Sequence, residues 1–143
     1  MDELSREIEI EKGRILTTLK ALKDALEREE RTIIELAAIA TFIHNIYNGV
    51  ENILKRILKS KGITIPRSET WHRDLLNSSV TNKIISYELS RRLEEYLAFR
   101  HFFTHGYGVM LDEEKLIPLA ENLPAVWENF ESEINKFLNL LRK

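Results

Sequence analysis

The feature that most constrains the fold of this chain is a long apolar stripe over residues 33–57. Hydrophobic side chains recur there three or four residues apart, over about seven helical turns. So wide a stripe needs more than one neighbouring helix to cover it, which predicts a helical bundle. Gly49 lies within it and costs about 1 kcal/mol relative to alanine, which suggests a close helix crossing at that point. The stripe comprises Ile33, Leu36, Ala40, Ile43, Tyr47, Val50, Leu54 and Ile57, and is widened by Ile39, Ile46 and Ile53.

Four further segments have helical patterns. The first covers residues 4–28. The helix that carries the long stripe comes second in the chain, and Gly62 and Pro66 end it. A short third helix follows with Ser68 as its N-cap, then a polar break at residues 77–79 and a fourth helix over residues 82–104. A final helical stretch is expected to be kinked or split at Pro124. We therefore predict an all-α fold, a single bundle of about five helices forming one domain over residues 1–143.

Composition excludes some classes of protein. The chain has 143 residues, no cysteine and a net charge of −2, so disulfides, thiolate metal sites and a cysteine nucleophile are excluded. The acidic start at Met1 does not look like a signal peptide, and no uninterrupted apolar run is long enough to span a bilayer. We expect a cytoplasmic protein without a membrane partner. Because the chain is not basic, contact with nucleic acid would require a local positive patch.

The apolar pattern is broken in the fourth segment. Leu89, Leu93 and Tyr96 form its stripe, and the next position at the same spacing is Arg100. A guanidinium on a buried seam is costly unless it is paired, hydrogen-bonded or faces a cleft. Arg100 is therefore either a structural ion-pair partner of a neighbouring helix or a functional residue.

Chemically active side chains are concentrated directly after this arginine. His101, His105 and Tyr107 follow within eight residues, in a chain with only four histidines and four tyrosines. In an undistorted helix Arg100 and His105 would lie about 140° apart. They can meet on one ligand only if the helix ends near Thr104 or if two copies of the segment face each other across a dimer axis.

The spacing of His101 and His105 also suits a pair of zinc ligands. However, the third ligand and the general-base glutamate usual in such a motif are missing, since Phe102, Phe103 and Thr104 lie between the histidines. We expect neither a metal nor a cofactor.

These residues resemble a known family. The pattern Arg-x4-His-x-Tyr, formed by Arg100, His105 and Tyr107, is similar to the signature of HepT-type toxins in the HEPN superfamily. His101 also fits, because a polar residue often follows the arginine in that superfamily. The sequence segments at residues 47–54, 71–76 and 99–103 are similar to those of the family as well. With the five-helix layout, the resemblance covers most of the chain.

The resemblance implies a metal-independent ribonuclease that cuts RNA at a cleft built from two copies of the motif in a homodimer. His105 would transfer protons, since its reference pKa of about 6.5 permits both roles near neutrality. Arg100 would bind the phosphate, and His101 would position the substrate or His105. The implied partner is a minimal nucleotidyltransferase (MNT) antitoxin. It would attach AMP to Tyr107 and so block entry of RNA.

Polar residues elsewhere could support such a site. His44, Asn48 and Glu51 share one side of the second segment. They could supply a carboxylate that orients His105, or they could simply face solvent. For His72 in the third segment, a capping or surface role is favoured over a place on an RNA path.

Two other functions compete with the ribonuclease. The first is a non-catalytic HEPN module that binds a nucleotide or acts as a scaffold for a nucleotidyltransferase, which the low net basicity favours. The second is a helical oligomerisation domain, which leaves Arg100 on an apolar stripe without explanation.

Overall fold

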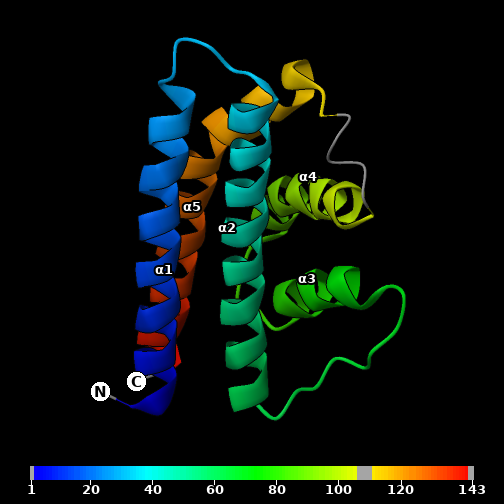
Figure 1. Cartoon of the computed structure of the whole chain (residues 1–143). Coiled ribbons are helices and arrows are strands. Elements are labelled where there is room, and N and C mark those ends of the chain that lie inside the picture. The colour runs from blue at the N-terminus through cyan, green and yellow to red at the C-terminus, as the bar shows by residue number, and fades with distance from the viewer. Residues whose placement is uncertain (1, 106–110, 142–143) are drawn as a thin grey trace.

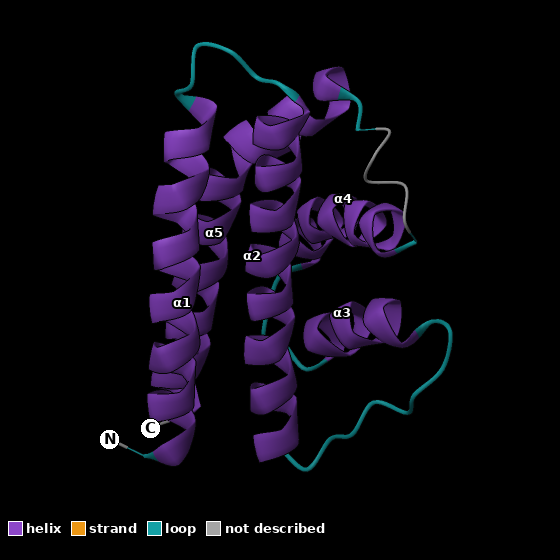
Figure 2. Ribbon diagram, viewed as in Figure 1, coloured by secondary structure: helices purple, strands orange, loops and turns teal. Residues whose placement is uncertain are grey.

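A computed structural model describes residues 2–105 and 111–141, and in this part of the chain every regular element is a helix (Figure 2). The prediction of an all-α fold of about five helices is thus confirmed. In chain order they are α1 (Glu3–Leu26), α2 (Ile33–Ser60), α3 (Trp71–Thr81), α4 (Tyr87–Thr104) and α5 (Glu113–Leu141).

The helices are arranged around α2 (Figure 1). The three long helices α1, α2 and α5 run side by side, whereas the shorter α3 and α4 lie on the other side of α2 and cross it. α2 contacts each of the other four helices. This central position explains why its sequence is apolar over so wide a surface.

The predicted stripe of α2 forms the core. All of its members are buried except Ile33, which is the first residue of the helix and is exposed. The close crossing predicted at Gly49 is confirmed, because a Cβ atom there would lie 2.7 Å from both Cγ1 and Cδ1 of Ile15. α1 therefore packs directly on the backbone of α2 at the turn that also carries Asn48 and Glu51.

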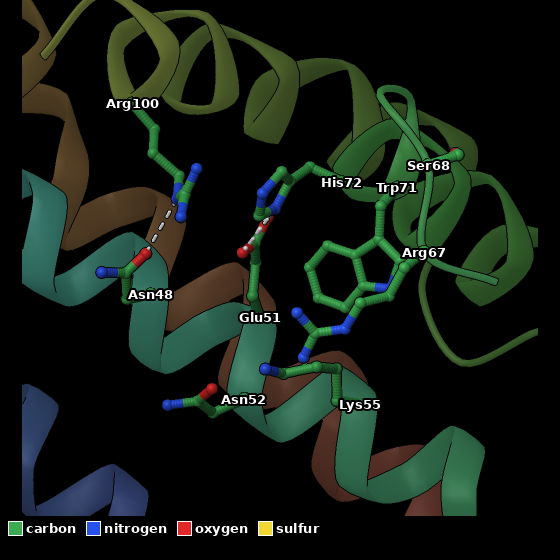
Figure 3. A pocket seen from close by; sticks show the side chains of 9 residues that line it. All are labelled: Asn48, Glu51, Asn52, Lys55, Arg67, Ser68, Trp71, His72 and Arg100. Carbon is green, nitrogen blue, oxygen red and sulfur yellow. Dashed lines mark hydrogen bonds and ion pairs between the residues drawn. The ribbon is translucent and has the colours of Figure 1, made fainter. Parts of the chain in front are cut away.

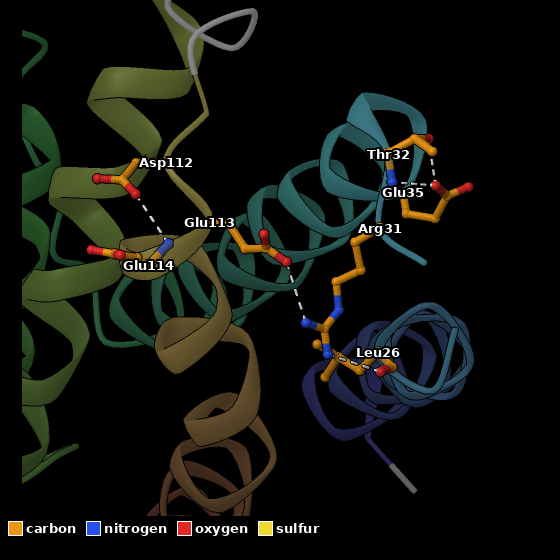
Figure 4. Close-up of polar contacts among 7 residues, drawn as sticks. All are labelled: Leu26, Arg31, Thr32, Glu35, Asp112, Glu113 and Glu114. Atoms are coloured by element: carbon orange, nitrogen blue, oxygen red, sulfur yellow. Dashed lines mark hydrogen bonds and ion pairs between the residues drawn. The ribbon is translucent and has the colours of Figure 1, made fainter. Parts of the chain in front are cut away.

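The loop between α1 and α2 is held by side chains (Figure 4). Thr32 caps α2, and its backbone N–H donates to Oε1 of Glu35 at 2.7 Å in a capping box. Arg31 donates to the Leu26 carbonyl of α1 and to Glu113 at the start of α5, both at 3.3 Å. One arginine thus connects the ends of three helices.

α2 also has the length and apolar composition that a membrane-spanning helix requires. The core helix of a bundle satisfies the same criterion. Its contacts with all four other helices support that interpretation here.

The predicted start of the third helix is wrong. α3 begins at Trp71 and follows Thr70, whose side chain makes no capping hydrogen bond. The hydroxyl of Ser68 instead accepts from the backbone N–H of Thr70 at 3.3 Å, so Ser68 stabilises a turn before the helix.

The predicted polar break at residues 77–79 is also wrong, because α3 continues to Thr81. Ser79 is fully buried and donates to the Leu75 carbonyl at 2.8 Å, which satisfies its hydroxyl inside the helix. α4 consequently begins at Tyr87 rather than near residue 82, and Ser86 caps it by accepting from the N–H of Leu89.

The last helix was expected to be kinked or split at Pro124, and it is not split. α5 runs from Glu113 to Leu141 with Pro118 and Pro124 inside it. Its contacts with α1, α2 and α4 stabilise the helix, although each proline removes a helical hydrogen bond. The Tyr96 hydroxyl of α4 donates to the Leu119 carbonyl at 2.8 Å and secures this region.

Candidate functional site

A cleft of about 450 Å³ opens where α2, α3 and α4 meet (Figure 3). α2 supplies one wall with side chains at successive turns, the loop before α3 and the start of α3 supply a second, and α4 supplies Arg100. The lining consists of Asn48, Glu51, Asn52, Lys55, Arg67, Ser68, Trp71, His72 and Arg100.

Arg100 faces this cleft from the position where the α4 pattern predicts a hydrophobic residue. Leu89, Leu93 and Tyr96 on the same stripe are buried, whereas Arg100 is half-buried. Its Nε donates to Oδ1 of Asn48 at 3.0 Å, which is its one hydrogen bond to the described residues. The structural ion pair considered from the sequence is not found in that part of the chain. The terminal nitrogens of the guanidinium are thus left available to a ligand.

Glu51 and His72 form a pair beside Arg100. Nδ1 of His72 lies 3.0 Å from Oε1 and 2.9 Å from Oε2 of Glu51, and Glu51 is only 3% exposed. Figure 3 shows the His72 imidazole next to the Glu51 carboxylate, with the Arg100 guanidinium to one side of the pair. The expectation that Glu51 faces solvent is wrong, because Glu51 is buried and its carboxylate contacts His72 within the same chain.

The lining carries positive charge. Lys55, Arg67 and Arg100 contribute three cations, and Glu51 is the one carboxylate among the nine lining residues. None of the three cations forms an ion pair within residues 2–105 and 111–141, although Lys55 Nζ lies 5.2 Å from the ring centroid of Trp71. A chain of net charge −2 therefore has the local positive patch that an anionic ligand requires.

Two buried groups near Arg100 have shifted pKa values. Burial, reinforced by the Arg100 guanidinium, lowers the pKa of His44. Burial and the nearby Glu51 carboxylate raise the pKa of Tyr47 well above its ordinary value. Nε2 of His44 and the Tyr47 hydroxyl are buried and have no hydrogen-bond partner among the described residues. Both side chains therefore lie close to the Arg100 guanidinium without forming a hydrogen bond to it.

His105 lies outside the cleft. It follows the last residue of α4, is exposed, and its Nδ1 lies 2.7 Å from the His101 carbonyl oxygen. The rings of His101 and His105 are in contact, with centroids 4.1 Å apart and planes tilted by 41°. Arg100 and His105 are therefore not brought together on one ligand within a single chain.

A second hollow of about 410 Å³ adjoins the cleft. It shares His72 and Arg100 with the cleft and is also lined by Arg73 and His101 and by the carboxylates of Glu69 and Glu94. His72 of α3 and Arg100 of α4 thus connect the two hollows. Tyr107, the expected site of AMP addition, lies outside the described residues.

Sequence reasoning missed much of this cleft. Lys55 carried a usable signal, because it follows Asn48 and Glu51 at helical spacing on the same face of α2. Arg67 comes from a loop, and the contact of His72 with Glu51 joins residues 21 positions apart, so neither had a local signal. No group of three histidine, aspartate or glutamate side chains suited to a metal occurs in the described part of the chain.

Comparisons with known proteins identify one family. A family model described as HepT-like protein matches residues 38–141, a span that includes every residue of the cleft. No curated protein and no solved structure matches the chain.

Proposed function

The chain belongs to the HepT-like protein family, and on that premise we propose that it is a metal-independent endoribonuclease, the toxin of a toxin–antitoxin pair. The observation that carries this proposal is Arg100. Its guanidinium interrupts a buried stripe, has one hydrogen bond to a described residue and faces a cationic cleft. Such a group suits a phosphodiester, whose oxygens match its planar fork.

The proposed reaction is attack of a ribose 2′-oxygen on the adjacent phosphorus. The O2′–P bond forms as the P–O5′ bond breaks, so the products are a 2′,3′-cyclic phosphate and a 5′-hydroxyl. One group must remove the 2′-OH proton and another must protonate O5′. His105 is proposed for proton transfer, Arg100 for the charge that develops on phosphate, and His101 for positioning. Asn48 supports Arg100 through its hydrogen bond.

A homodimer is part of the proposal. His105 is exposed and lies outside the cleft that contains Arg100. A second copy of the chain can bring its His105 to this Arg100, and twofold symmetry would create two such sites.

Regulation is proposed to come from an MNT-type nucleotidyltransferase antitoxin that adds AMP to Tyr107. Tyr107 follows His105 by two residues, so the added phosphate and nucleoside would lie beside the proposed site. The modification would then add negative charge next to a positively charged RNA path.

A second candidate is a non-catalytic module that binds a nucleotide or acts as a scaffold for the nucleotidyltransferase. The net charge of −2 and the separation of His105 from the cleft favour it. In that case the cleft would bind nucleotides without cutting RNA.

The test uses purified dimer and mixed-sequence RNA in EDTA, with Arg100→Ala and His105→Ala variants. We expect each variant to lose about 10²-fold or more in activity. Mixing the two should restore about one quarter of wild-type activity, because half of random dimers are heterodimers with one complete site of two. Equal cleavage by wild type and both variants would overturn the site, and no cleavage by wild type would favour the non-catalytic module.

A further inference from the structure

The pair formed by His72 and Glu51 has no part in the proposed chemistry, although it shares a cleft with Arg100. The imidazole lies in the linings of both hollows, and so does Arg100. A histidine, a buried carboxylate and an unpaired guanidinium therefore meet within one chain (Figure 3). This is the set of side chains that a phosphodiester-cleaving site needs.

We propose that His72, positioned by Glu51, is the catalytic base of this cleft and acts on the RNA phosphodiester that the Arg100 of the same chain binds. The proposal rests on the ribonuclease function proposed above. It assigns removal of the 2′-OH proton to His72 and leaves His105 of a second copy to protonate O5′.

The geometry favours a base at His72. A carboxylate accepts hydrogen bonds and cannot donate them when ionised, so the hydrogen bond to Glu51 places the proton of neutral His72 on Nδ1. Nε2 then carries a free lone pair. When Nε2 takes a proton, the ring gains a positive charge that the adjacent Glu51 carboxylate compensates.

The surroundings suit RNA as the ligand. Lys55 and Arg67 line the same cleft and form no ion pair with described residues. Trp71 offers an aromatic surface for a base next to them. A nucleotide on Trp71 with its phosphate toward the cations would extend along the cleft to Arg100 and His72.

In the proposed step, Nε2 of His72 accepts the 2′-OH proton as O2′ bonds to phosphorus. The P–O5′ bond breaks, and O5′ takes a proton from His105 of the other copy. When the cyclic phosphate and the 5′-hydroxyl product leave, His72 is protonated and His105 is deprotonated. Proton exchange with water resets them, so no other reactant is needed.

The opposing interpretation is that His72 only provides a hydrogen-bond donor to a buried carboxylate. His72→Asn separates the two, because the asparagine amide can take the place of Nδ1 and donate to Glu51 but cannot accept a proton. We expect His72→Asn to fold with a thermal midpoint close to wild type and to lose about 10²- to 10⁴-fold in kcat. Wild-type kcat in this variant would overturn the proposal, yet leave the ribonuclease function standing.

Chemical rescue gives a readout that a structural role would not affect. His72→Ala opens space where the imidazole was, and added imidazole should restore part of its cleavage in a concentration-dependent manner. Arg100→Ala is the matched control, since imidazole cannot replace a guanidinium. Failure of imidazole to rescue folded His72→Ala, or equal rescue of both variants, would contradict the assignment.

The order of proton transfers can be tested with RNA that has sulfur in place of the bridging O5′. A thiolate leaves without a proton, so this substrate should suppress the defect of His105→Ala. The defect of His72→Asn should persist because a base is still required. Suppression of the His72→Asn defect would show that His72 acts as the acid and would overturn the role proposed.

Mixed dimers test whether His72 and Arg100 act in the same chain. A mixture of Arg100→Ala with His72→Asn should stay inactive, because each chain then lacks one member of its own cleft. Recovery of activity in this mixture would place the two residues in different chains and contradict the proposal. If wild type cleaves no RNA, the ribonuclease function itself fails, and the His72 assignment fails with it.

Discussion

Replacing Gly49 by alanine tests how α1 supports the site. The added Cβ would lie 2.7 Å from Cγ1 and Cδ1 of Ile15, far inside van der Waals contact. Ile15 is only 2% exposed, so it cannot turn away into solvent. Either Ile15 adopts a strained conformation or α1 moves away from α2.

Gly13 provides a matched control within α1. A Cβ atom there would meet no other atom within 4 Å, and the position is exposed. Each glycine-to-alanine change should gain about 1 kcal/mol of helix propensity. Only Gly49→Ala should also suffer overpacking, which costs about 1–3 kcal/mol. The difference between the two variants therefore isolates the steric cost.

The assay is urea unfolding followed by circular dichroism, with the RNA cleavage rate measured in parallel. We expect Gly13→Ala to be about 1 kcal/mol more stable than wild type and Gly49→Ala to be about 1–3 kcal/mol less stable than Gly13→Ala. Cleavage should fall in Gly49→Ala alone, because Asn48 and Glu51 share its helical turn. Equal stabilisation by both changes would refute the close crossing.

Three further predictions concern the cleft cations, the buried His44 and the hydrogen bond of Tyr96. Lys55→Gln and Arg67→Gln should each weaken binding of non-cleavable 2′-O-methyl RNA, measured by fluorescence anisotropy. The negative slope of log affinity against log salt should become shallower by about 1 for each variant. An unchanged slope would show that these residues do not contact the RNA. Burial lowers the pKa of His44 below its ordinary 6.5, so just below pH 6.5 the unfolded chain binds more protons at this residue than the folded chain does. Stability should therefore fall as the pH drops below 6.5, and His44→Gln should reduce that fall in urea titrations at several pH values; an identical pH dependence would contradict the assignment. Tyr96→Phe removes the hydrogen bond to the Leu119 carbonyl and should cost about 1 kcal/mol in thermal unfolding, whereas an unchanged midpoint would show that this bond does not stabilise α5.

The sequence predicted the centre of the fold well because periodicity alone identifies it. The stripe of α2 repeats at helical spacing, and a helix apolar on several sides must lie among its neighbours. The close crossing at Gly49 could be predicted for a similar reason, since a glycine destabilises the interior of a helix unless a neighbouring element packs closely against it. Arg100 was found because it breaks a pattern that Leu89, Leu93 and Tyr96 establish.

The errors in the predicted helix bounds arose where a polar side chain forms a hydrogen bond to the backbone of its own helix. Residues 77–79 looked like a break, yet Ser79 bonds to the Leu75 carbonyl one turn earlier and is buried. The contact of His72 with a carboxylate was missed for a different reason. Its partner Glu51 lies on another helix, and composition and spacing say nothing about which distant residues will meet.

The most direct test of the ribonuclease activity is the cleavage of a mixed-sequence oligoribonucleotide in EDTA, beside a fully 2′-O-methylated copy of the same sequence. The ends of the products are then identified by mass spectrometry. If the protein cleaves RNA by 2′-OH attack, only the unmodified RNA is cut and the fragments carry 2′,3′-cyclic phosphate and 5′-hydroxyl ends. Cleavage of the methylated copy, fragments with 5′-phosphate ends, or no cleavage at all would contradict that mechanism.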